Sequence, residues 1–78
     1  MPKTLRSRGH RALIAILVAT RRDAQLTQRQ LADRLQRPQS FVSKIEAGER
    51  RLDVVEFVAI AKALKVEPGV LFERFLRW

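Results

Sequence analysis

Residues 26–50 read LTQRQLADRLQRPQSFVSKIEAGER and contain two short helical patterns on either side of a proline. The first pattern covers about 28–36, where apolar residues recur at the spacing of one helical face. Thr27 is a suitable N-cap, and Gln30 completes a Thr-x-x-Gln capping box with it. The inner face of this helix is predicted to consist of Leu31, Ala32 and Leu35.

The second pattern covers about 39–47 and follows at once. Pro38 suits the start of a helix because its φ is fixed, and it prevents one continuous helix through residues 36–38. Gly48 suits the left-handed conformation that ends many helices. Two short helices across such a tight turn predict a helix-turn-helix arrangement.

The two sides of the 39–47 helix differ in chemistry. At about 100° per residue, Phe41, Val42 and Ile45 fall on one side, which we assign to the core. A helix with small polar side chains outside can approach base edges in the major groove, and we predict that this outer side reads DNA. The alternative is a face that is only solvated, although such a face usually includes acids. The outward residues are Gln39, Ser40, Ser43 and Lys44.

The rest of the chain adds three more helical patterns, at about 9–23, 54–64 and 68–77, and no sustained strand-like alternation. The fold class is therefore all-α with five helices. Residues 1–8 lack periodicity and are basic, so we predict a flexible arm there and one domain over 9–78.

The composition favours a polyanionic partner. Sixteen Lys and Arg against eight Asp and Glu give a net charge of +8, and twelve of the sixteen cations are arginine, which suits phosphate contact. The chain has no cysteine, and its apolar runs are too short to span a bilayer, so we expect a cytoplasmic protein. Solubility alone is the competing explanation of the charge.

The stretch 26–50, followed by Ala61-Lys-Ala-Leu-Lys-Val, resembles the Cro/repressor helix-turn-helix family, also called the XRE type. The similarity covers about residues 13–72. It implies a five-helix, lambda-repressor-like domain and a bacterial or phage-encoded regulator. Leu-Thr-Gln, Leu-Ala, Ser-Lys-Ile-Glu-x-Gly and Ala-Leu-x-Val at these spacings carry the resemblance.

The resemblance also implies roles for individual residues. Gln39 is expected to pair with adenine in the major groove, with Ser40, Ser43 and Lys44 beside it. Glu46 borders the core face and is expected to pair with Arg21, which would hold the reading helix in place. The expected contacts to backbone phosphates are Gln28, Arg37, Arg50 and Arg51.

Gln36 departs from the family pattern, which often has glycine at the opening of the turn. If φ is positive there, a side chain costs roughly 1 kcal/mol. The register of the helix that follows therefore stays open from the sequence alone.

The last helix is more apolar than a monomer of this size can cover. We predict that it forms the contact of a symmetric homodimer on a palindromic operator, because exposed aromatic patches usually mark interfaces. The alternative is a core-packed helix with a frayed end. The predicted contact residues are Leu71, Phe72, Phe75, Leu76 and Trp78.

Together these features predict a DNA-binding transcription regulator, most simply a repressor or autoregulator, without catalysis, cofactor or metal. His10 is the single histidine and has no cysteine to share a metal with. Two alternatives stay open: an antitoxin that binds a toxin, and a protein-interaction module on the same fold. RNA polymerase is a further possible partner.

Overall fold

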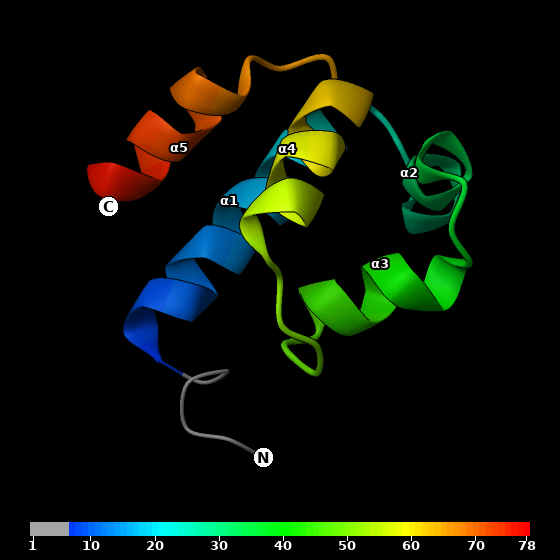
Figure 1. Cartoon of the computed structure of the whole chain (residues 1–78), viewed down its shortest axis with the longest axis horizontal. Coiled ribbons are helices and arrows are strands. Elements are labelled where there is room, and N and C mark those ends of the chain that lie inside the picture. The colour runs from blue at the N-terminus through cyan, green and yellow to red at the C-terminus, as the bar shows by residue number, and fades with distance from the viewer. Residues whose placement is uncertain (1–6) are drawn as a thin grey trace.

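A computed structural model describes residues 7–78, and these residues form five helices (Figure 1). The all-α prediction is confirmed. The predicted arm lies largely outside the described residues. The helix bounds are α1 Arg8–Asp23, α2 Gln28–Leu35, α3 Gln39–Glu46, α4 Val54–Ala63 and α5 Pro68–Leu76.

The first helix begins one residue earlier than expected. Ser7 has an extended backbone, and its Oγ accepts a hydrogen bond from the His10 backbone N–H at 3.1 Å, so it is the N-cap of α1. Along α1, Ile14 and Leu17 are fully turned to the interior, whereas Leu13 is only partly buried.

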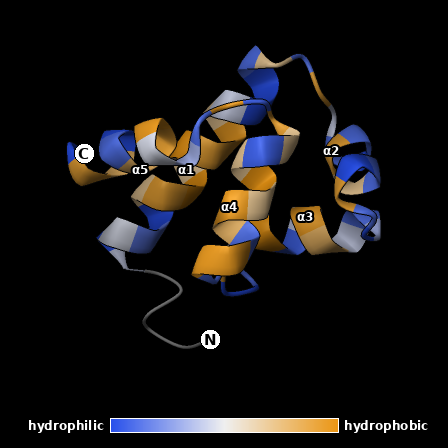
Figure 2. Cartoon of the chain, turned by 45° about the horizontal axis from the view of Figure 1, so that its top comes forward, coloured by the Kyte–Doolittle hydropathy of each residue, from blue (hydrophilic) through white to orange (hydrophobic). Residues whose placement is uncertain are grey.

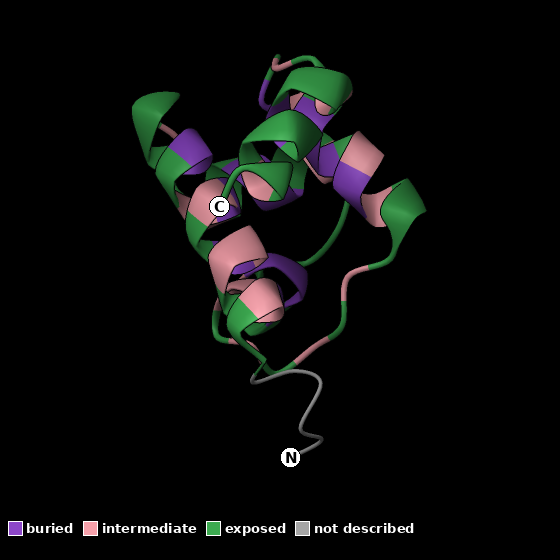
Figure 3. Cartoon of the chain, turned by 90° about the vertical axis from the view of Figure 1, so that its left-hand side faces the viewer, coloured by how far each residue is buried: buried purple, intermediate pink, exposed green. Residues whose placement is uncertain are grey.

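The helices enclose one core. α1 packs against α3 and α5, α2 packs against α3 and α4, and α4 packs against α5. Figure 3 shows the buried ribbon on the inner sides of the helices, while most of α5 is exposed. The buried apolar residues are Ile14, Leu17, Leu31, Ala32, Phe41, Val42, Ile45, Phe57, Ile60, Ala61, Leu64 and Leu71.

Capping boxes begin α2 and α4. In α2, Thr27 Oγ1 accepts from the Gln30 backbone N–H at 3.0 Å, and Gln30 Oε1 accepts from the Thr27 backbone N–H at 2.9 Å. Asp53 and Glu56 form the equivalent pair at the start of α4. These reciprocal bonds satisfy backbone donors that a helix start leaves open, so both starting points are well defined.

Four helices end through a residue with positive φ, and three of these residues are not glycine. The values are 60° at Gln25, 57° at Gln36, 75° at Gly48 and 60° at Lys65. At Gln36, the next backbone N–H, that of Arg37, donates to the Ala32 carbonyl at 3.0 Å, as in a Schellman motif. The turn before α3 thus keeps the geometry that glycine usually provides, and α3 begins at Gln39 as expected.

Within residues 7–78, no helix is both long enough and apolar enough to cross a membrane.

Candidate nucleic-acid interface

The third helix separates its residues as the sequence predicts. Phe41, Val42 and Ile45 are buried, so the opposite side of α3 faces outward. Gln39, Ser40 and Lys44 are exposed.

Ser43 is oriented differently from the other three predicted reading residues. It is half-buried, and its Oγ donates to the Ser40 carbonyl of the same helix at 3.3 Å. The structure therefore presents an amide, a hydroxyl and an ammonium group on one side of α3, with a second hydroxyl at the edge.

A buried ion pair fixes α3 against α1. Arg21 Nε donates to Glu46 Oε2 at 2.7 Å and Arg21 Nη2 donates to Glu46 Oε1 at 3.0 Å. Both side chains are 10% exposed. Arg21 Nη1 also donates to the Leu26 carbonyl at 2.7 Å, which ties the pair to the segment between α1 and α2. A two-point contact of this kind restricts both sliding and rotation of α3.

The amide of Gln28 joins the same cluster. Its Nε2 donates to Glu46 Oε1 at 2.9 Å, and the residue is half-buried at the first position of α2. A side-chain amide nitrogen carries two hydrogens, so one remains after the bond to Glu46. The start of α2 and the end of α3 are therefore connected through one carboxylate.

Two arginines lie over the ring of Phe41 from the segments on either side of α3. The guanidinium carbon of Arg37 lies 4.6 Å from the ring centroid, and that of Arg50 lies 4.7 Å from it. Both distances are typical of cation–π contact. The buried ring of Phe41 thus orders two of the cations that were predicted to bind phosphate.

Arg50 is also held by an acid. Its Nη1 and Nη2 donate to the two oxygens of Glu56 at 2.9 Å and 2.8 Å, and Nη1 donates to the Arg51 carbonyl at 2.8 Å. The hydrogen bonds from Arg50 hold the pKa of Glu56 below its usual value, against the opposing effect of partial burial. The same contact raises the pKa of Arg50.

Comparisons with known proteins agree with this geometry. The profile of a family described as "Helix-turn-helix domain" matches residues 13–75. An XRE-family-like protein from Pseudomonas syringae pv. tomato is 43% identical, covers 96% of this chain and 92% of its own, and superposes with a TM-score of 0.88. The chain belongs to the XRE-type helix-turn-helix family. It is thus a DNA-binding protein of a family of transcription regulators.

Two further structures share the fold of this XRE-type domain. The restriction-modification controller protein C.Esp1396I is 25% identical, with 91% of this chain and 93% of that chain covered and a TM-score of 0.84. The clp gene regulator ClgR from Corynebacterium glutamicum is 21% identical, with 90% of each chain covered and a TM-score of 0.78. No curated protein matches the sequence.

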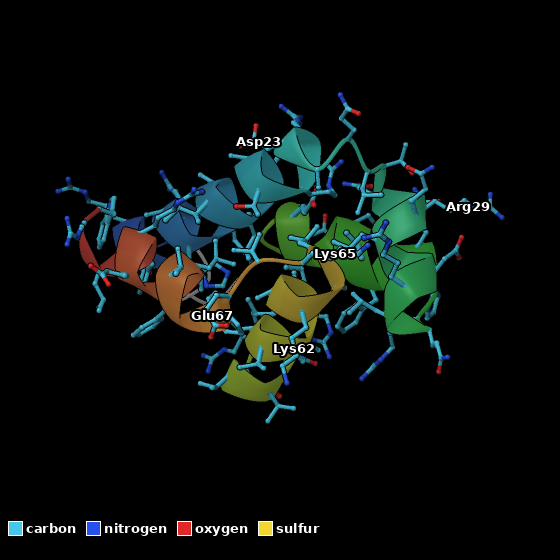
Figure 4. All side chains as sticks on the ribbon, turned by 90° about the horizontal axis from the view of Figure 1, so that it is seen from above. Asp23, Arg29, Lys62, Lys65 and Glu67 are labelled. Carbon is cyan, nitrogen blue, oxygen red and sulfur yellow. The ribbon has the colours of Figure 1, made fainter. Side chains whose placement is uncertain are left out.

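Two residues of this XRE-type domain escaped the sequence analysis. Arg29 is exposed in the first turn of α2, beside Gln28, and Figure 4 shows it at the outer edge of the molecule. A cation in the first turn of a helix interacts unfavourably with the helix dipole. This unusual placement is the feature of the sequence that could have identified Arg29. The second residue is Glu56, because nothing in the sequence spacing shows that it pairs with Arg50.

The last helix of this XRE-type domain requires one correction. Leu71 is 0% exposed and belongs to the core of its own chain, so it cannot form part of a free face. Phe72, Leu76 and Trp78 are exposed, and Phe75 is half-buried. The apolar residues of α5 form a stripe along the helix. One edge of this stripe packs inward, and Leu71 lies on that edge.

A continuous row of aromatic residues starts in the core at Phe57 of α4, runs along α5 and ends at Trp78, just after that helix. Phe57 contacts Phe72 with ring centroids 6.1 Å apart, Phe72 contacts Phe75 at 5.9 Å, and Phe75 stacks on Trp78 at 5.8 Å. An apolar groove of about 330 Å³ runs beside Phe72, between α5 and the start of α4. Figure 2 shows hydrophobic ribbon along α5 and at the start of α4.

Proposed function

We propose that this protein is a sequence-specific transcription regulator that binds a palindromic operator as a homodimer and acts as a repressor or autoregulator. The observation that carries the proposal is the outward side of α3, where Gln39, Ser40 and Lys44 are exposed. The one carboxylate of α3, Glu46, is turned inward to Arg21. The proposal includes no catalytic step.

In the proposed complex α3 enters the major groove and its side chains contact base edges. Gln39 has an amide that can donate to and accept from adenine at once, and it is at the first position of the helix. Ser40 and Lys44 lie on the same side. Ser43 Oγ can accept from DNA while it donates to the Ser40 carbonyl, but it can donate to DNA only after that bond is broken.

Phosphate contacts flank the reading helix. The second amide hydrogen of Gln28 is available to a phosphate while the first stays on Glu46, and the start of α2 adds the favourable end of a helix dipole. The exposed cations Arg29, Arg37 and Arg51 surround this region. Such contacts supply most sequence-independent affinity.

The proposed dimer uses the exposed side of α5. Within residues 7–78, the large exposed hydrophobic residues occur only in the first turn of α4 and in or just after α5. In Figure 1, α5 and α3 lie on opposite sides of the molecule, so pairing through α5 leaves both reading helices accessible. The large exposed residues are Val54, Val55, Val70, Phe72, Leu76 and Trp78.

Selection of bound sites from random duplex DNA tests the proposal. A homodimer with two reading helices predicts an inverted repeat whose half-sites are about one helical turn, or roughly 34 Å, apart. A single unrepeated site would contradict the dimer, and a failure to enrich any sequence would contradict sequence-specific binding.

A further inference from the structure

We infer that Glu56 limits the affinity of this domain for the DNA backbone by neutralising Arg50, a cation in the segment just after α3. The inference rests on the proposed function, because it concerns the residues beside the reading helix. It corrects the view of Arg50 as a simple phosphate contact. In this account Arg50 and Glu56 approach DNA as a neutral pair.

The existing hydrogen bonds of Arg50 leave it few N–H groups for a phosphate. Two of its N–H groups donate to the two oxygens of Glu56 at 2.9 Å and 2.8 Å, and a third donates to the Arg51 carbonyl. A guanidinium has five N–H donors, so only two remain. A phosphate that approaches Arg50 must therefore share it with a carboxylate that is already in contact.

The carboxylate of Glu56 cannot easily move away from this contact. Its Oε1 also accepts from the Asp53 backbone N–H at 3.0 Å, and its own backbone N–H donates to Asp53 Oδ1 at 2.7 Å. The side chain of Glu56 is 13% exposed, whereas that of Arg50 is 36% exposed. The acid is the fixed partner of the pair.

The influence of Glu56 extends to the second arginine of the cluster. Arg37 and Arg50 both lie over the ring of Phe41, and the positive charge of Arg37 also favours the ionised form of Glu56. One carboxylate thus opposes the cations from both segments that flank α3. A substitution that removes this charge should therefore strengthen contact with the DNA backbone on both sides of α3.

Glu56→Gln tests the inference with little disturbance to the helix. The Gln side chain keeps an oxygen for the Asp53 backbone N–H, so the cap of α4 is retained. We expect tighter binding to a random-sequence duplex, by at least about five-fold at 50 mM salt, from one gained phosphate contact per protomer. The slope of log K against log salt should steepen by about 0.9 per protomer.

Glu67→Gln is the matched control. It removes the same charge from the N-cap of α5, where the side chain makes no capping bond. Figure 4 looks down on the end of the molecule opposite α3 and shows Glu67 there. Because the change in net charge is equal, this variant measures the long-range effect alone, and its affinity should change less than two-fold.

The double variant Arg50→Gln with Glu56→Gln provides a second test that does not depend on Glu56→Gln alone folding well. Removal of a neutral pair should leave duplex affinity within about two-fold of the parent protein and the salt slope unchanged. Arg50→Gln alone should bind more weakly, because it leaves an unpaired carboxylate near DNA.

The inference is overturned if Glu56→Gln binds no more tightly than Glu67→Gln, or if the double variant loses affinity and its salt slope becomes shallower. The first result would mean that Glu56 does not limit binding, and the second would mean that Arg50 is a full phosphate contact that Glu56 only orients. If the parent protein itself binds no duplex at low salt, the proposed function fails, and that result is separate from the comparison among variants.

Discussion

Replacement of Glu46 by alanine should strongly destabilise the domain, because it leaves the guanidinium of Arg21 without its main partner inside the protein. Removal of one partner from a buried ion pair costs about 3–5 kcal/mol. Two bonds from Arg21 and one from Gln28 are lost, but the bond from Arg21 to the Leu26 carbonyl remains. We therefore expect a loss near the lower limit, about 3 kcal/mol.

Urea unfolding measures this loss directly. A domain of this length has a stability of roughly 4–12 kcal/mol, so a loss of about 3 kcal/mol is a large part of the total. The midpoint urea concentration should fall, while the slope of the unfolding free energy against urea concentration should stay the same. The melting temperature should fall by roughly 12–24 °C.

Glu73→Ala is the control for this prediction. Its carboxylate pairs with Arg77 at 2.7 Å, but these side chains are 59% and 78% exposed. An exposed pair contributes at most about 1 kcal/mol, so this variant should stay close to the parent protein. If Glu46→Ala loses less than about 1 kcal/mol, or no more than Glu73→Ala, the buried pair does not hold α3 against α1.

Further predictions concern a turn, an acid and α5. Gln36→Gly should raise the free energy of unfolding by up to about 1 kcal/mol and Gly48→Ala should lower it by about as much in urea titrations, since φ is 57° and 75° at these positions. As pH falls through the lowered folded-state pKa of Glu56, the stability that its charge contributes above its ordinary pKa should be lost. Thermal melts of Glu56→Gln against pH should lack this step. Leu71→Ala should cost about 2–5 kcal/mol of unfolding free energy. Leu76→Ala should leave the monomer nearly as stable but weaken self-association in sedimentation equilibrium, since Leu76 is 65% exposed.

The sequence predicts the helix-turn-helix well because its local signals agree with one another. The Thr27 capping box, Pro38 and Gly48 each act within a few residues, and the periodic apolar positions of α3 face the core as expected. Even Gln36, which departs from the family pattern, adopts the left-handed conformation that the turn requires. The backbone N–H of Arg37 still donates to the Ala32 carbonyl there, so the turn forms although glycine is absent.

Contacts between distant segments are less visible in the sequence. The stripe on α5 shows that this helix has an apolar side, but not that Leu71 at its edge is fully covered by its own chain. Likewise, Arg50 is a cation in a plausible place, yet its pairing with Glu56 depends on how the loop after α3 returns to α4. Hydrophobic periodicity describes one helix at a time, so it does not show which distant segments of the chain come into contact.

The central claim is that the outward side of α3 reads base edges, and the most direct measurement is the ranking of operator variants by the parent protein and by Gln39→Ala. Each single-base variant of the selected site is titrated at one salt concentration. Loss of the Gln39 contact should cost about 1–3 kcal/mol and abolish the preference at one position of each half-site, while the other positions keep their order. An unchanged ranking would contradict the assignment of Gln39 to a base and, with it, the proposed placement of α3 in the groove.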